Sequence, residues 1–193
     1  LPQTGKDDFL PFYREGDDKG RVYRVTPKNT APRVSIRDLT TQLNSIDGRV
    51  KALESSNGWL RDKAHMMILW HKDTAAVPDL LKLTRKSDHA LARAHALSVL
   101  DGLGALTGEL LVEALHDPDA NVRTHALRLA ETKHDDAVVR EAVKLADDKD
   151  AKVRLQLACS LGEWKQSDAG TALAKLAARP DNDEFTRAAI LSS

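Results

Sequence analysis

The chain has 193 residues, about the size of one ordinary domain, and its 41% hydrophobic and 30% charged residues place it among folded globular chains. Its 29 basic residues balance 29 acidic residues, which argues against a nucleic-acid-binding domain of the kind that carries a basic excess. A single cysteine, Cys159, excludes an internal disulfide and the paired-cysteine motif that attaches haem.

Residues 1–35 differ from the rest of the chain. They contain four of the seven prolines, and the segment Arg21–Thr26 is rich in strand-forming residues and is stopped by Pro27. A single strand is not stable alone, so this strand needs sheet partners or the helical part of the chain to pack against. The predicted domains are therefore an extended segment over residues 1–35 and a helical domain over residues 36–193.

The helical domain is predicted to consist of short helices in pairs. Each is only a few turns long, so it depends on packing against its neighbours. Polar residues that precede the helices are predicted N-caps, namely Asp88, Asp119 and Asp150, with Ser167 or Asp168 before the final pair. The predicted helices span residues 38–45, 50–55, 59–71, 75–86, 89–101, 107–116, 119–132, 135–147, 150–164, 168–178 and 183–191.

Five arginines recur at intervals of 30 to 33 residues, in similar surroundings. A fixed period of this length is typical of a solenoid, in which each helix pair buries its apolar face only against its neighbours. The positions one before, three after and seven after each arginine are almost wholly apolar, as a buried helical stripe requires. The arginines are Arg61, Arg93, Arg123, Arg154 and Arg187.

These arginines predict a structural ladder. Each lies one residue from the apolar stripe, with acidic residues a few positions earlier in the inter-helix turn. Arg123 and Arg154 are predicted to reach Asp117, Asp119 or Asp148 in their own or adjacent turns. Because a guanidinium group can hold a carboxylate through two hydrogen bonds, such a ladder would fix the register between repeats.

Two segments carry a resemblance to a known repeat family. Asp117–Arg123 and Asp148–Arg154 share an aspartate followed by valine and arginine, and they resemble bacterial HEAT-like repeats. The resemblance covers about residues 48–193. It implies an all-α, right-handed HEAT-like solenoid of four to five helix pairs, and it says little about function because such repeats serve many unrelated proteins.

A narrower resemblance covers more of the chain. The segment Asp18–Val25 is similar to the closing strand of a large bacterial β-propeller, and Leu53–Asp62 resembles the junction that follows it in propeller–HEAT–cytochrome proteins of planctomycetes and verrucomicrobia. This resemblance implies an exported or periplasmic protein with a dehydrogenase-like propeller. It transfers no catalytic residues, because the propeller blades that would carry them are missing from these 193 residues.

The seven histidines prompt a test for metal ligation. His95 and His125 lie two residues after their arginines, and equivalent residues of stacked helices are roughly 10 Å apart. Zinc needs its ligands at about 2 Å, so we expect a solvated face and predict no metal site. The residues around Trp70 are interpreted as core packing, and Cys159 as a buried, inert thiol.

No arrangement of residues predicts catalysis. The adjacent carboxylates Asp135 and Asp136, and Asp147 and Asp148, fall at helix ends, where aspartate caps a helix or stabilises its first turn. We find no activated nucleophile and no glycine-rich phosphate loop. The sequence therefore predicts neither catalytic residues nor a cofactor.

The predicted interaction face lies on the second helix of each pair. Its mixed polarity suits a protein partner or a neighbouring domain of the same chain. Trp59 and Trp164 would be binding anchors if exposed, although core packing is the preferred interpretation. The candidate residues are Lys63, His95, Thr124, His125, Arg128, Gln156 and Ser160.

The expected function is therefore that of a non-catalytic scaffold, which positions a propeller domain or a partner. Two alternatives stay open. The segment could belong to a sugar or alcohol dehydrogenase-like enzyme whose catalytic residues lie elsewhere. It could also be a HEAT solenoid that binds nucleic acid, which a basic surface on the second helices would indicate.

Overall fold

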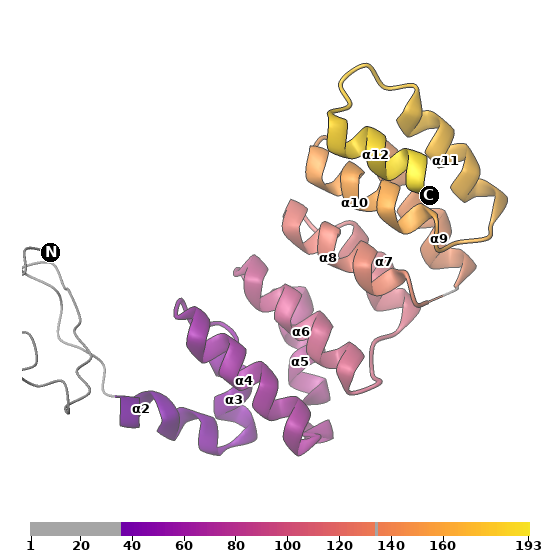
Figure 1. The fold of residues 1–193 in the computed structure, drawn as a ribbon. Coiled ribbons are helices and arrows are strands. Elements are labelled where there is room, and N and C mark those ends of the chain that lie inside the picture. The colour runs from indigo at the N-terminus through magenta and orange to yellow at the C-terminus, as the bar shows by residue number, and fades with distance from the viewer. Residues whose placement is uncertain (1–35, 134) are drawn as a thin grey trace, which may run out of the picture. The chain divides into compact units, whose positions relative to one another are not determined.

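Stacked helix pairs make up the part of the chain that the computed structural model describes, residues 36–133 and 135–193 (Figure 1). These residues belong to one unit, residues 35–193, and contain no strand. The extended segment predicted for residues 1–35 lies outside the described residues. The helices are α2 Ile36–Thr41, α3 Ile46–Ala52, α4 Gly58–His71, α5 Val77–Lys86, α6 Ala90–Gly102, α7 Gly108–Leu115, α8 Ala120–Ala130, α9 Asp136–Ala142, α10 Ala151–Leu161, α11 Ser167–Ala177 and α12 Glu184–Ser192, with short 3₁₀ helices η1 Gln42–Asn44, η2 Thr74–Ala76 and η3 Val143–Asp147.

Two layers run through this unit. The second helices α4, α6, α8, α10 and α12 lie side by side, each packed on the next, while α3, α5, α7, α9 and α11 form the other layer (Figure 1). The unit is an all-α solenoid, as predicted. Some predicted boundaries were wrong: the helix predicted over residues 135–147 is α-helical only to Ala142 and continues as η3, and that predicted over 150–164 ends at Leu161. Helix α3 begins at Ile46 and not at Val50, because the Ser45 hydroxyl accepts a hydrogen bond from the N–H of Gly48 and starts the helix there.

The core is the predicted apolar stripe of the second helices. Ala64, Ala96, Ala126 and Leu157, each three residues after its arginine, are fully buried. Only Ile190 in the last helix is partly exposed at this position. Since each short helix buries its stripe against adjacent helices, stability comes from nearest-neighbour packing along the array.

Aspartates cap the second helices α8 and α10. The carboxylates of Asp119 and Asp150 each accept a backbone N–H from two residues on, at 2.8 Å. Asp135 caps α9 in the same way. These three side chains therefore satisfy amides that would otherwise be free at a helix start.

Two predicted caps were wrong. The N-cap of α6 is His89. Asp88 lies one residue too early, since in the repeat alignment it corresponds to Pro118, which precedes the N-cap Asp119 of α8. The N-cap of α11 is Gln166, and Ser167 is already inside the helix. The side chain of Gln166 does not cap the helix and donates a hydrogen bond to Asp136 at 3.0 Å instead.

The caps of α6 and α8 give a matched pair of substitutions. Asp119→Ala should lower the free energy of unfolding by about 1 kcal/mol, because it removes a cap hydrogen bond. Asp88→Ala should change it by less than about 0.5 kcal/mol, because Asp88 caps nothing. Urea unfolding at pH 7 measures both, and equal losses would contradict the cap assignment.

Candidate interaction surface

Arg123 joins two consecutive inter-helix turns. Its Nη1 donates to the carbonyl of Asp117 in its own turn at 2.8 Å, while its Nε and Nη2 donate to the carboxylate of Asp148 in the following turn at 2.7 and 2.8 Å. The same carboxylate accepts the N–H of Asp150 at 2.8 Å. One aspartate therefore orders its own turn and holds the preceding repeat.

Arg93 makes the same two-bond link, whereas Arg154 makes it through one hydrogen bond and leaves its Nε buried without a partner. Arg93 holds the carboxylate of Asp117 through two hydrogen bonds of 2.7 Å, and Arg154 holds Asp181 at 2.9 Å. Each also donates to a backbone carbonyl of its own turn at 2.8 Å. Asp119, the other predicted acid, caps α8. In these three repeats the ladder thus runs from the arginine to the turn of the next repeat.

The pair of Arg123 and Asp148 is almost dry, with side chains 8% and 6% exposed. Burial alone would raise the pKa of Asp148, but the hydrogen bonds from Arg123 and from the N–H of Asp150 outweigh it and hold the pKa below its ordinary value. Removing one partner of such a pair leaves a buried charge and costs about 3–5 kcal/mol. The pair therefore holds the two repeats in one register.

Arg49 supplies a link that the sequence analysis missed. It donates to the Leu43 carbonyl at 2.7 Å and to the Asp73 carboxylate at 2.8 Å. Arg49 lies 12 residues before Arg61 and so falls outside the arginine period. A signal was present nonetheless: Ser45 caps α3 four residues before Arg49, as Asp119 caps α8 before Arg123.

The link is missing at Arg61. Its Nη1 donates to the carbonyl of Ser55 at 2.7 Å, but its Nε is buried without a partner. In the turn between α5 and α6, which Arg61 would reach, Ser87 occupies the position that Asp117 and Asp148 occupy in their turns. The assignment follows because the Ser87 carbonyl accepts a hydrogen bond from Arg93, as the carbonyls of Asp117 and Asp148 do from Arg123 and Arg154. A hydroxyl thus stands where the neighbouring turns have a carboxylate.

The fifth arginine, Arg187, is exposed. Within the described part of the chain it holds no carboxylate. It therefore differs from Arg93, Arg123 and Arg154, all of which reach the turn of a following repeat.

The predicted interaction residues form a hydrogen-bonded row between adjacent second helices. The Nδ1 atoms of His65 and His95 are 3.1 Å apart, and the Nε2 of His95 is 3.7 Å from the Asp62 carboxylate. One imidazole must donate to the other, so double protonation would place two N–H groups face to face. His125 continues the row, with its Nε2 2.5 Å from the Ser98 hydroxyl.

Further along the row, Arg128 donates to Gln156 at 2.7 Å. The amide of Gln156 donates to Glu131 at 3.0 Å, and the Ser160 hydroxyl donates to the same carboxylate at 2.7 Å. Thr124 bonds the carbonyl of Ala120 within its own helix. Of the candidate side chains, Arg128 of α8 and Gln156 of α10 thus bind each other across the helix contact.

The expected solvated histidine face is only partly solvated, because His65, His95 and His125 are partly buried. Burial lowers the pKa values of His65, His95 and His125, with further lowering of the His95 pKa by His65 and of the His125 pKa by Arg128. Asp62 opposes the shifts of His65 and His95, and Asp101 opposes that of His125. These imidazoles lie between helices because the second helices are packed close enough to cover them.

Large apolar side chains are exposed on α4 and α6. Trp59 is 51% exposed, Trp70 68% and Leu91 54%. The prediction of core packing was wrong for Trp59 and Trp70 and was correct for Trp164, which is buried. Trp70 lies nine residues after Arg61, away from the buried stripe, and the Nζ of Lys63 lies 5.6 Å from the centre of its ring.

Cys159 is also exposed, which corrects the expectation of a buried thiol. It lies five residues after Arg154, at the position that exposed Arg128 occupies after Arg123. The buried residues of α10 are Val153, Arg154, Leu157, Ala158, Ser160 and Leu161. Leucine and alanine neighbours in the sequence therefore do not imply burial on this helix.

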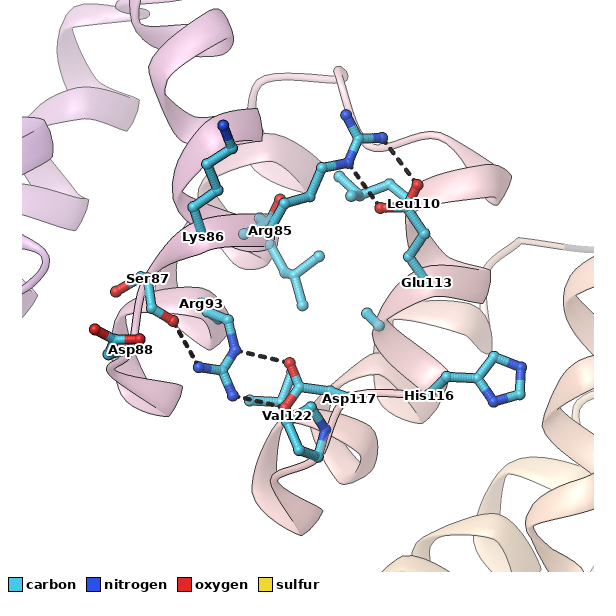
Figure 2. A pocket seen from close by; sticks show the side chains of 14 residues that line it. Arg85, Lys86, Ser87, Asp88, Arg93, Leu110, Glu113, His116, Asp117 and Val122 are labelled. Carbon is cyan, nitrogen blue, oxygen red and sulfur yellow. Dashed lines mark hydrogen bonds and ion pairs between the residues drawn. The ribbon is translucent and has the colours of Figure 1, made fainter.

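A cavity of about 550 Å³ lies between the pairs α5–α6 and α7–α8 (Figure 2). Arg85 bridges it to Glu113 through hydrogen bonds of 2.7 and 3.0 Å, and Arg93 bridges it to Asp117. Both guanidinium groups are already neutralised by these carboxylates. The cavity is the gap between two repeats and lacks a free arginine for an anionic ligand.

Within residues 36–133 and 135–193, no helix combines the length and the apolar character needed to cross a bilayer. The same residues contain no group of three or more histidine, cysteine, aspartate or glutamate side chains placed to hold a metal ion.

Substituting Ser87 tests the missing link. Ser87→Asp should raise the free energy of unfolding by about 1 kcal/mol, because it offers a carboxylate to the unpaired Nε of Arg61. Part of the gain is lost because Ser87 now donates to Glu54. Ser87→Asn is the matched uncharged control in urea unfolding at pH 7. The assignment fails if the aspartate variant is no more stable than the asparagine variant.

The partly buried imidazoles of His65, His95 and His125 predict that the free energy of unfolding depends on pH. In the unfolded chain histidine binds protons below about pH 6.5, whereas the lowered pKa values keep the folded imidazoles neutral to lower pH. The free energy of unfolding should therefore fall as pH decreases from 8 to 5.5. His65→Gln with His95→Gln should flatten this dependence, and exposed His71→Gln should leave it unchanged. Identical pH profiles for all three proteins would contradict the assignment.

The comparisons agree with the geometry. A family model described as HEAT repeats matches residues 108–193, which include α7 to α12. None of the curated proteins matches the chain. HEAT repeats generally mediate protein interaction or scaffolding and are a non-catalytic scaffold fold. Residues 108–193 are therefore similar to HEAT repeats and form part of an all-α solenoid.

Proposed function

We propose that this array is a non-catalytic interaction module whose partner-binding surface lies on α4 and α6. The observation that carries the proposal is the exposure of Trp59, Trp70 and Leu91 on two adjacent second helices. Tryptophan is enriched among the residues that dominate binding energy at protein interfaces. A solenoid presents such residues on an extended, rigid surface.

The middle repeats lack the exposed apolar side chains of α4 and α6. Trp59 and Leu91 each lie two residues before the arginine of their helix, and the counterparts in α8 and α10 are Asn121 and Lys152. If large apolar residues were needed here for folding, the middle repeats would carry them too. Among the described second helices, only α12, at the other end of the array, repeats this feature, with Phe185 66% exposed two residues before Arg187. The pairing of exposed Trp59, Trp70 and Leu91 on the adjacent helices α4 and α6 favours binding of a partner there.

Charge along the second helices favours a protein partner over nucleic acid. Arg93, Arg123 and Arg154 are engaged with carboxylates. The second helices also carry Asp62 and Glu131 beside their lysines and arginines. A binding surface for phosphates needs accessible positive charge, which this mixture does not supply.

In its parent protein, the module would hold a dehydrogenase-like propeller in position relative to a cytochrome domain or a partner. The resemblance of Leu53–Asp62 to the propeller–HEAT junction supports this context, as does that of Asp18–Val25 to a closing propeller strand. In this proposal the catalytic residues belong to the propeller. In this proposal the array itself only holds the propeller in position.

The test uses the tagged chain as bait in a lysate of its source organism and against any domains that flank it in the gene. The variant Trp59→Ser with Trp70→Ser should weaken binding of a captured partner at least about 30-fold, as expected for loss of interface anchors. Its urea midpoint should stay close to that of the unchanged chain, because both side chains are largely exposed.

Exposed Lys82→Ser on α5 is the control, since it alters the other helix layer. It should bind like the unchanged chain. Recovery of no partner, or binding by the double variant within threefold of the unchanged chain, would refute the proposed surface.

A further inference from the structure

The last helix leaves exposed a position that the inner repeats bury. Leu191 lies four residues after Arg187 and is 88% exposed. Its counterparts are Leu97, Leu127 and Ala158, which are 1%, 0% and 0% exposed. Since the inner residues are covered by the repeats around them, Leu191 marks a face of α12 that no described residue covers.

The charge at this end shows the same pattern. Arg93, Arg123 and Arg154 each hold an aspartate that lies 24 to 27 residues further along the chain, in the turn of the next repeat. Arg187 occupies the equivalent place, is exposed, and meets no carboxylate within the described residues. The end face therefore presents a guanidinium group beside an apolar side chain.

Helix α11, the first helix of the last pair, also exposes positions that an inner repeat buries. Gly170 and Ala177 are exposed, whereas Val139 and Ala146, at the same distances from the N-cap of α9, are 1% exposed. A Cβ added at Gly170 would meet nothing within 4 Å. Terminal repeats that face water usually carry a polar outer surface, and this one carries small and apolar residues.

We propose that the end face of α11 and α12 binds a further helix pair of the same repeat type, which stacks on the array and supplies an aspartate to Arg187. The chemistry is that of the three described links, repeated once more. A symmetric second copy fits poorly, because it would place two Arg187 side chains against each other. This inference does not depend on the proposed surface of α4 and α6.

The chain itself provides the probe. A copy of residues 130–161 joined after Ser193 keeps the register, because Ser193 follows Arg187 by the same six residues that separate Leu129 from Arg123. The copied Asp148 then lies 25 residues after Arg187, as Asp148 does after Arg123. Hydrogen exchange of the α12 amides and the urea midpoint report whether the copy docks.

In the extended chain, exchange of the α12 amides should slow by about tenfold or more, and the urea midpoint should rise. Changing the copied aspartate to asparagine, or Arg187→Gln in the extended chain, should remove most of this protection. Unprotected amides throughout the copy, with α12 unchanged, would refute the proposal.

Sedimentation of the original chain tests the competing occupant. A monomer that is insensitive to Leu191→Glu is the expected result. A dimer that Leu191→Glu dissociates would show that the end face pairs with itself, and would overturn the proposal.

Discussion

The array depends on one recurring contact, the guanidinium–carboxylate pair through which Arg49, Arg93, Arg123 and Arg154 each hold an aspartate of a following turn. An aspartate such as Asp148 has three duties at once: its carboxylate holds Arg123, receives the N–H of Asp150, and its carbonyl receives Arg154. A buried ion pair is weak evidence for added stability, because desolvation offsets much of the attraction. Its value here is geometric, since the paired donors of Arg93 and Arg123 meet both oxygens of their aspartates in only one stacking register.

Apolar packing and the ladder have separate roles. Alanine and leucine in the stripe provide non-directional burial, which would tolerate small shifts of one helix pair along another. The bidentate contact tolerates no such shift, because both N–H donors of Arg123 must meet the two oxygens of Asp148. Together they explain why short helices of three turns form a regular array.

The sequence could predict the solenoid, most of its helices and the buried apolar stripe of the second helices. These features follow from a local spacing of apolar residues that recurs in every repeat. The links Arg93–Asp117 and Arg123–Asp148 required only the additional knowledge of which turns are adjacent. The link from Arg49 to Asp73 was not predicted, because Arg49 lies outside the regular spacing of the other arginines. The burial of His65 and His95, and the exposure of Trp70, depend on how closely α4 and α6 pack, which no single helix pattern encodes.

The absent carboxylate at Ser87 has a consequence for cooperativity. In a one-dimensional array, unfolding divides where the coupling between neighbouring repeats is weakest. The joint between α4 and the turn that contains Ser87 lacks the guanidinium–carboxylate pair, although Ser87 donates a hydrogen bond to Glu54 across it. Trp59 and Leu91 stand on opposite sides of that joint. A ligand that binds both residues would hold the two repeats together. Binding of the ligand should therefore stabilise the array against unfolding at this joint.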